Sequence, residues 1–213
     1  MIFDDKVALT LAEKLLQIKA IKLQAHKPFK WASGWNSPIY CDNRVTLSYP
    51  DLRTYIKKHL AQLISDRFPD VQLIMGVATA GIAQGALVAE YLGLPFAYVR
   101  PEPKKHGMGK QIEGRVEIGQ RVVLIEDLVS TGKSCIKTFS ALEEAELELL
   151  GTAAIFSYGF EQARENFKNA GSIYYSLSDY NALLKIALQN GDIKEADLAL
   201  LNEWRNAPEV WGR

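Results

Sequence analysis

The sequence predicts an α/β protein with a Rossmann-like central parallel sheet flanked by helices, for three reasons. From about residue 70 onward, short apolar runs alternate with segments of helical periodicity. These runs are nearly continuous in apolar residues, which is typical of strands buried on both faces of a parallel sheet. Residues 1 to about 45 do not follow this alternation and are predicted to form a small N-terminal subdomain.

The chain before the alternation is predicted to hold two helices and a segment of turns. Asp4 and Asp5 can cap a first helix, because apolar residues recur at helical spacing after them. Residues 29–44 are rich in aromatic residues, glycine, serine and asparagine, and predict short strands and turns. Pro50 starts a second helix, which ends near Phe68.

The alternating part predicts five strands, at residues 73–77, 96–99, 122–125, 153–156 and 173–176. Helices are predicted between them and after the last one: up to residue 92, from about 132 to 150, and around 161–170, 180–189 and 193–205. A single domain is expected over residues 1–213. Within it we expect an N-terminal helix and subdomain at about 1–45, the core sheet at about 70–178 and C-terminal helices at about 179–213.

Composition excludes several classes of protein. Lys and Arg number 25, as do Asp and Glu, and this zero net charge argues against a nucleic-acid binder. Cys41 and Cys135 lie far apart without a CxxC pattern, so reduced thiols are expected. The first residues are acidic and no apolar run approaches the ~20 residues of a membrane span. A soluble, cytoplasmic protein that binds neither membrane nor nucleic acid is therefore expected.

Residues 122–134, VVLIEDLVSTGKS, carry the main functional motif. Glu126 and Asp127 are expected directly after a strand, where open parallel sheets bind ligands. Two adjacent acids can accept hydrogen bonds from two vicinal hydroxyls, such as those of ribose. Residues 130–134 are expected to open a helix, whose free N–H groups, hydroxyls and dipole would hold a phosphate. The motif therefore predicts a site for a phosphorylated ribose.

Two simpler interpretations of this motif were considered. A Walker A loop would need glycine at position 127, where Asp127 stands. A plain helix cap would explain one acid but not the whole run.

A second turn and a long loop add to this site. Ala78, Thr79, Ala80 and Gly81 follow another strand, and small residues let backbone amides approach a phosphate closely, so this turn is a candidate pyrophosphate loop. Residues 100–114 place Arg100, Lys104, Lys105, His106 and Lys110 among glycines. A solvated loop is the simplest interpretation, but loops this long are often lids. A basic lid would neutralise a departing pyrophosphate and exclude water, and His106 could protonate or hydrogen-bond it.

Three segments in order resemble one family. Residues 122–134 resemble the phosphoribosyl-diphosphate (PRPP) signature of type I phosphoribosyltransferases. Residues 33–44 are similar to that family's substrate-side hood, and residues 99–107 and 111–114 to its catalytic loop and the far edge of that loop. The likeness covers nearly the whole chain and is greatest to the orotate-specific members. It implies the type I phosphoribosyltransferase fold with a small N-terminal hood.

The resemblance implies transfer of the 5-phosphoribosyl group from PRPP to orotate. The products are orotidine 5′-monophosphate and pyrophosphate, in de novo pyrimidine (UMP) biosynthesis. It implies catalytic roles for Lys104, His106 and Asp127, and an orotate contact at Ser130. The implied PRPP contacts are Arg100, Lys104, Lys105, His106, Glu126, Asp127, Leu128, Val129, Ser130, Thr131, Gly132, Lys133 and Ser134. It also implies Mg²⁺ bound mainly through PRPP, with no protein ligand assigned, and a homodimer that shares the mobile loop between subunits.

The chain departs from the family pattern at three places. Ala32 and Pro101 stand where some members carry basic residues, and residues 158–160 stand where some carry an orotate-binding arginine. Arg44, with Tyr40 as a stacking face, is predicted to supply part of the missing contact. Two alternatives remain: a phosphoribosyltransferase for another base, which needs a different hood, and a PRPP-sensing regulator, which predicts a degraded basic loop.

Overall fold

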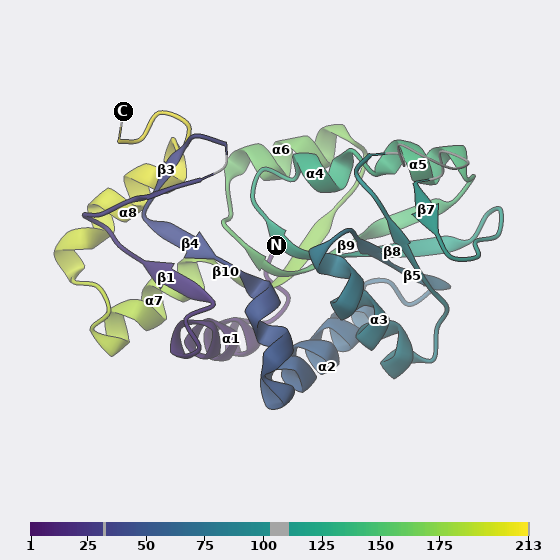
Figure 1. Ribbon diagram of the computed structural model, residues 1–213, viewed down its shortest axis with the longest axis horizontal. Helices are drawn as coiled ribbons and strands as arrows, with labels where there is room; N and C mark the ends of the chain where they lie inside the picture. Colours follow the sequence, from purple (N-terminus) through teal and green to yellow (C-terminus); the bar gives the residue numbers. More distant parts are fainter. Residues whose placement is uncertain (32, 103–110, 213) are drawn as a thin grey trace.

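The computed structural model describes residues 1–31, 33–102 and 111–212. Its centre is a six-stranded sheet in the order β10-β9-β8-β5-β6-β7 (Figure 1). The strands are β5 (Leu73–Val77), β6 (Phe96–Val99), β7 (Ile112–Glu113), β8 (Arg121–Val129), β9 (Glu148–Ser157) and β10 (Tyr174–Asp179). Every pairing is parallel except that of β7 with β6. The predicted Rossmann-like parallel sheet is therefore confirmed.

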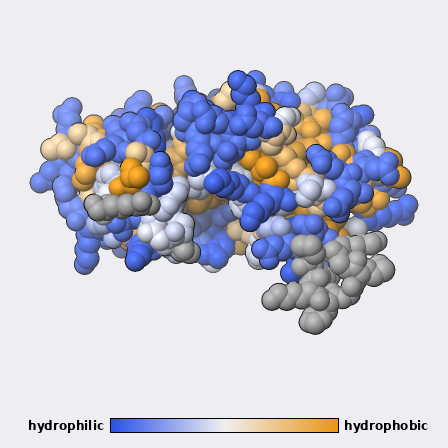
Figure 2. Space-filling model, turned by 90° about the horizontal axis from the view of Figure 1, so that it is seen from above, coloured by the Kyte–Doolittle hydropathy of each residue, from blue (hydrophilic) through white to orange (hydrophobic). Residues whose placement is uncertain are grey.

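Helices cover both faces of the sheet (Figure 1). One face carries α1 (Asp5–Gln17), α2 (Pro50–Arg67) and α3 (Ala80–Leu92), and the other carries α4 (Lys133–Ile136), α5 (Phe139–Glu144) and α6 (Glu161–Asn169). The central strands are buried because both layers pack on them, and all five residues of β5 are buried. Seen from the side of α4 to α6, hydrophilic residues cover most of the surface and hydrophobic ones show between them (Figure 2).

The N-terminal segment forms short strands and turns, as predicted. β1 (Ile21–Leu23) pairs antiparallel with β4 (Ile39–Cys41), and β2 (Phe29–Lys30) pairs antiparallel with β3 (Asn36–Ser37). A 3₁₀ helix, η1 (Asn43–Ser48), leads from β4 to α2. After the sheet come α7 (Tyr180–Asn190), the 3₁₀ turn η2 (Glu195–Asp197) and α8 (Leu198–Asn206), which lie at the same end of the molecule as β1 and β4 (Figure 1). No helix in the described ranges is long and apolar enough to cross a membrane.

The predicted third strand ends at residue 125, which is four residues too early. β8 continues to Val129, so Glu126 and Asp127 lie within the strand rather than after it. The reason is that β9 is also longer than predicted and pairs with β8 as far as Val129 and Ser157. The last strand is shifted in the same direction, since β10 starts at Tyr174 and ends at Asp179.

The predicted helix over residues 132–150 is wrong in its second half. In the structure this segment forms two short helices, α4 and α5, and β9 already begins at Glu148. Between the helices, the Thr138 hydroxyl donates to the Cys135 carbonyl at 2.6 Å, a local bond that competes with helix continuation. Glu146 has a φ of +53°, which ends the second helix. The loop predicted over residues 100–114 is also shorter than expected. Ile112 and Glu113 near its end form β7, which pairs with β6.

Candidate active site

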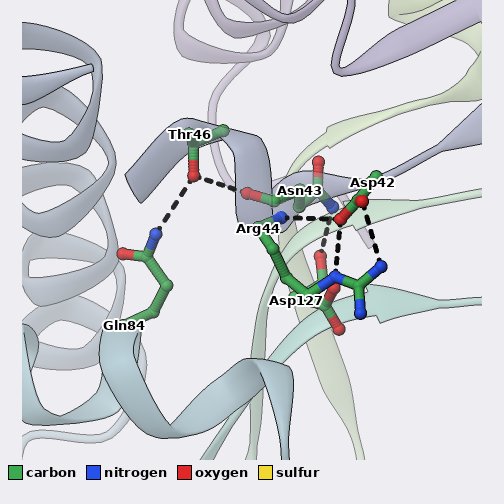
Figure 3. Close-up of polar contacts among 6 residues, drawn as sticks. All are labelled: Asp42, Asn43, Arg44, Thr46, Gln84 and Asp127. Atoms are coloured by element: carbon green, nitrogen blue, oxygen red, sulfur yellow. Dashed lines mark hydrogen bonds and ion pairs between the residues drawn. The ribbon is translucent and has the colours of Figure 1, made fainter. Parts of the chain in front are cut away.

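Most of the predicted site residues within the described ranges lie toward the carboxyl ends of β5 and β8. The turn at residues 78–81 follows β5, and residues 130–134 follow β8. Asp127 of β8 lies beside the start of η1, and Gln84 of α3 lies on the other side of η1 (Figure 3). The sheet therefore brings together two anion loops, two acids and a segment of the hood, which are distant in sequence.

Residues 130–132 form a turn between β8 and α4, and residues 133 and 134 are the first two of α4. Gly132 has a φ of +76° and is the N-cap of α4, while Lys133 and Ser134 are exposed. The amide of Asn166 donates to the Thr131 carbonyl at 2.8 Å and fixes the loop against α6. Because α4 has only four residues, the predicted contribution of a helix dipole is small. A bound phosphate would depend mainly on the backbone N–H groups of the loop itself.

Glu126 and Asp127 are adjacent carboxyl groups in a largely buried setting. Glu126 is 6% exposed; its Oε1 accepts from the Asp127 amide at 3.2 Å, and its Oε2 has no partner among the described residues. Burial raises the pKa of Glu126 well above its ordinary value of 4.5, and the charge of Asp127 raises it further. Burial also raises the pKa of Asp127, and hydrogen bonding with Glu126 offsets only part of that rise. As the pH falls, the first proton that this pair binds therefore goes to Glu126, and Asp127 is the better anionic acceptor.

The two residues before the phosphate loop have side chains turned to the protein. Val129 is 1% exposed, and its carbonyl accepts from the Tyr158 amide at 3.1 Å. Leu128 is partly buried and packs against the core. A contact of PRPP with Val129 can therefore involve only its main-chain atoms, while Leu128 keeps part of its side chain accessible.

The turn at residues 78–81 lies close to the sheet. A side chain at Gly81 would collide with the Ile125 carbonyl oxygen, and one at Gly76 would lie 2.6 Å from the Gly81 carbonyl oxygen. Both glycines are therefore required for α3 to begin directly beside β5 and β8. The 13-residue α3 presents its first N–H groups at this edge, as an anion site requires.

A cleft of about 580 Å³ joins this turn to the start of the basic loop. It is lined by Ala78, Thr79, Ile82, Tyr98, Arg100, Pro101 and Glu102. The Arg100 main chain is fixed on both sides, because its N–H donates to Gln111 and its carbonyl accepts from the Gln111 side chain. Arg100 thus lies beside the candidate pyrophosphate loop. Lys104, Lys105, His106 and Lys110 lie outside the described residues.

Of the two predicted orotate contacts in the hood, Arg44 is the one that lies near the acids. Tyr40 is 41% exposed, and its ring lies 5.8 Å from that of Phe29. Arg44 forms a two-point ion pair with Asp42, at 2.6 Å and 2.9 Å, and its charge lowers the pKa of Asp127. The sequence assigned no role to Asp42 within the hood, although its carboxylate occupies one edge of the Arg44 guanidinium.

Three further polar residues were also missed. Asn43, Thr46 and Gln84 are buried, and hydrogen bonds join them to the Asp127 main chain (Figure 3). The signal in the sequence is an isolated glutamine within the apolar helix AGIAQGALVAEYL. That signal marks a buried polar group but does not indicate its partner.

Residues 158–160, where some family members carry an arginine, have a structural role here. Tyr158 and Phe160 are each 2% exposed, and the Tyr158 ring stacks on Trp31 at 5.2 Å. Trp204 of α8 packs against both rings. This cluster ties the hood and the last helix to the end of β9. Ala32, the first departure, lies outside the described residues.

A parallel sheet that carries two candidate anion loops and a buried acid pair at the carboxyl ends of its strands is typical of proteins that bind phosphorylated sugars. The phosphoribosyl transferase domain family matches residues 48–175. Orotate phosphoribosyltransferases of Cytophaga hutchinsonii and Bacteroides thetaiotaomicron are 51% and 53% identical to this chain; the alignments cover 94% of the chain and 96% and 94% of those proteins. The chain belongs to the phosphoribosyltransferases and, among them, to the orotate phosphoribosyltransferase family.

Solved structures agree with this assignment. The orotate phosphoribosyltransferase from Aeropyrum pernix is 28% identical, with a TM-score of 0.74 over 86% of this chain and 99% of that one. Adenine phosphoribosyltransferase from Leishmania tarentolae, at 20% identity and a TM-score of 0.61 over 85% of this chain and 92% of that one, shares the fold alone.

Proposed function

We propose that this protein transfers the 5-phosphoribosyl group from PRPP to orotate, giving orotidine 5′-monophosphate and pyrophosphate in pyrimidine biosynthesis. The observation that carries the proposal is the buried Glu126–Asp127 pair between two anion loops, in a chain of this family. Glu126 Oε2 has no partner among the described residues, so a ligand hydroxyl is a suitable donor to it.

In the proposed reaction, a ring nitrogen of orotate forms a bond to C1 of the ribose and loses its proton, which the departing pyrophosphate can take up. The bond from C1 to pyrophosphate breaks, and its electron pair leaves with pyrophosphate. No protein nucleophile is required. Glu126 and Asp127 hold the ribose hydroxyls, residues 130–134 hold the 5-phosphate, and residues 78–81 with Arg100 hold the pyrophosphate. The protein therefore contributes positioning at both ends of the donor and positive charge at the leaving group.

Mg²⁺ is proposed as the cofactor. The described residues contain no group of three His, Cys, Asp or Glu that could hold a metal by themselves. Mg²⁺ is usually bound by one or two carboxylates together with substrate phosphates, so PRPP itself would supply most of its ligands. Asp127 is the carboxylate of this chain best placed for that role, and the ion would supply charge neutralisation at the leaving pyrophosphate.

We further propose a homodimer in which the basic loop of one subunit serves the neighbouring site, acting in the cytoplasm. The first part rests on the family resemblance, and the second agrees with the two free cysteines. Sedimentation at assay concentrations tests the dimer, since a fully active monomer would contradict a shared loop. Cell fractionation tests the compartment.

The direct test mixes the protein with Mg²⁺, PRPP and orotate and follows the loss of orotate absorbance. Adenine, hypoxanthine and uracil serve as controls. Turnover of a purine but not of orotate would establish the alternative base. Binding of PRPP without turnover of any base would favour the sensing regulator.

Lys104→Ala tests the catalytic loop. We expect kcat to fall about tenfold, with Kd for PRPP changed less than about twofold, because a charge near the leaving group acts mainly as negative charge develops there. Lys105 remains and limits the loss. Steady-state kinetics and calorimetric PRPP binding measure both quantities, with the exposed Lys185→Ala in α7 as the matched control. An unchanged kcat would reject the catalytic role of Lys104.

A further inference from the structure

A buried hydrogen-bond network links three distant segments of the chain beside the site (Figure 3). Gln84 of α3 donates to the Thr46 hydroxyl at 3.2 Å, and that hydroxyl donates to the Asn43 carbonyl at 2.6 Å. The Asn43 side-chain amide then donates to the Asp127 carbonyl at 2.7 Å. We call Asn43, Thr46 and Gln84 the buried network.

The composition of this network is unfavourable for packing alone. The three side chains are 1%, 0% and 2% exposed, and buried polar groups are costly unless they are fully paired. Two acceptors, Asn43 Oδ1 and Gln84 Oε1, have no partner within the described part of the chain. Apolar residues of similar size would fill the same space without this cost, so the network has a purpose other than burial.

The network contacts the main-chain carbonyl of Asp127, at a point where β5 no longer pairs with β8. β5 pairs with β8 only as far as Gly76 and Ile125, so no strand bonds Asp127 on that side. The Asn43 amide takes the place of a strand partner there. On the other side of β8, the pairing with β9 continues to Val129.

The opposite end of the network lies on the helix that begins at the pyrophosphate loop. Gln84 is one turn inside α3, whose first residue is Ala80. The network therefore spans from the acid pair, which faces the ribose, to the element that faces the pyrophosphate. In the proposed function the acid pair and the start of α3 contact the same PRPP molecule. The distance between them must therefore match the distance between the ribose and the pyrophosphate of PRPP.

We infer that Asn43, Thr46 and Gln84 are positioning residues, which fix the Asp127 main chain and the start of α3 at the spacing that PRPP requires. The inference rests on the proposed function, because PRPP is the molecule that spans the two loops. None of the three touches the reacting atoms, so they act through Asp127 and α3.

Thr46→Val is the most direct test, because it keeps the side-chain shape and removes the hydroxyl that joins two bonds of the network. We expect KM and calorimetric Kd for PRPP to rise about tenfold, while KM for orotate changes less than about twofold. Thr46→Ser keeps the hydroxyl and should restore both values to within about twofold of the wild type. A merely structural role would predict neither the split between substrates nor the rescue.

Two further variants keep the test decisive. Gln84→Met, at the far end of the network, should raise KM and Kd for PRPP by the same amount without raising KM for orotate. This variant tests the inference even if Thr46→Val does not fold. Ser178→Ala removes an equally buried side-chain bond, to the Ala8 carbonyl at 2.8 Å, and should lower the melting temperature without changing PRPP binding. Equal losses for both substrates, or no loss with Thr46→Val and Gln84→Met, would overturn the inference. Absence of orotate turnover by the wild type would instead reject the proposed function.

Discussion

Gly132→Ala is expected to raise KM for PRPP about 100-fold, because a misplacement of about 1 Å at a positioned group can cost that much. Gly132 has a φ of +76°, and a methyl group there would lie 2.7 Å from the Phe167 ring. The ring is 1% exposed and packs against Tyr174 at 4.7 Å, so it cannot move away easily. The phosphate loop must shift instead. Steady-state kinetics and calorimetric titration with PRPP measure the loss.

The matched control is Gly191→Ala, at the end of α7. Gly191 has nearly the same φ, +77°, but a methyl group there meets nothing within 4 Å. The left-handed backbone should cost each variant about 1–2 kcal/mol of stability, the usual cost for alanine, and the collision with Phe167 adds to the cost for Gly132→Ala alone. Only Gly132→Ala should also lose PRPP binding.

The double variant Gly132→Ala with Phe167→Leu separates the two effects at the loop. A smaller side chain at position 167 relieves the collision but leaves the unfavourable φ, so part of the PRPP affinity should return. A Gly132→Ala protein with wild-type KM for PRPP would show that the loop does not hold the phosphate.

The sequence predicts the parallel sheet and the turns after β5 and β8 because these depend on local patterns. Apolar runs mark buried strands, and small residues after them mark turns with free amides. The end of β8 could not be predicted in this way, since Glu126 and Asp127 interrupt the apolar run. Their strand conformation depends on pairing with β9, which is a tertiary contact.

The supporting residues were harder to predict for a related reason. Asn43, Gln84 and Asn166 each bond to a main-chain or hydroxyl group that is 35 or more positions away in sequence. Their residue types suggest buried polar groups but give no indication of a partner. The ion pair of Arg44 with Asp42 is local, only two positions apart, and the spacing alone could have suggested it.

Glu126→Gln is expected to stabilise the protein at neutral and higher pH and to lower its activity. The folded state raises the pKa of Glu126, so it binds this proton more tightly than the unfolded chain does. The resulting stabilisation is fully present below about pH 4.5, the ordinary value, and is lost as pH rises through the folded-state pKa. Glutamine cannot ionise and avoids that loss. Each unit of pKa shift corresponds to about 1.4 kcal/mol.

Thermal unfolding across pH tests the first half of this prediction. The melting temperature of Glu126→Gln should exceed that of the wild type above the folded-state pKa, and the difference should shrink toward pH 4.5. A difference that does not depend on pH would show that Glu126 contributes by packing alone. The fold should be kept, because the glutamine oxygen can still accept from the Asp127 amide as Glu126 Oε1 does.

The activity of Glu126→Gln tests the second half. The variant places an NH₂ group where the wild type has the unpartnered Oε2, and NH₂ cannot accept a hydrogen bond from a ribose hydroxyl. A lost hydrogen bond to a charged group is worth about 1.5–3 kcal/mol, so kcat/KM for PRPP should fall by up to about 100-fold. Wild-type kcat/KM would mean that Glu126 stays protonated during turnover, and that Asp127 alone accepts hydrogen bonds from the ribose. A more stable but less active variant would instead show that the chain accepts the cost of burying this carboxyl group because PRPP requires an acceptor there.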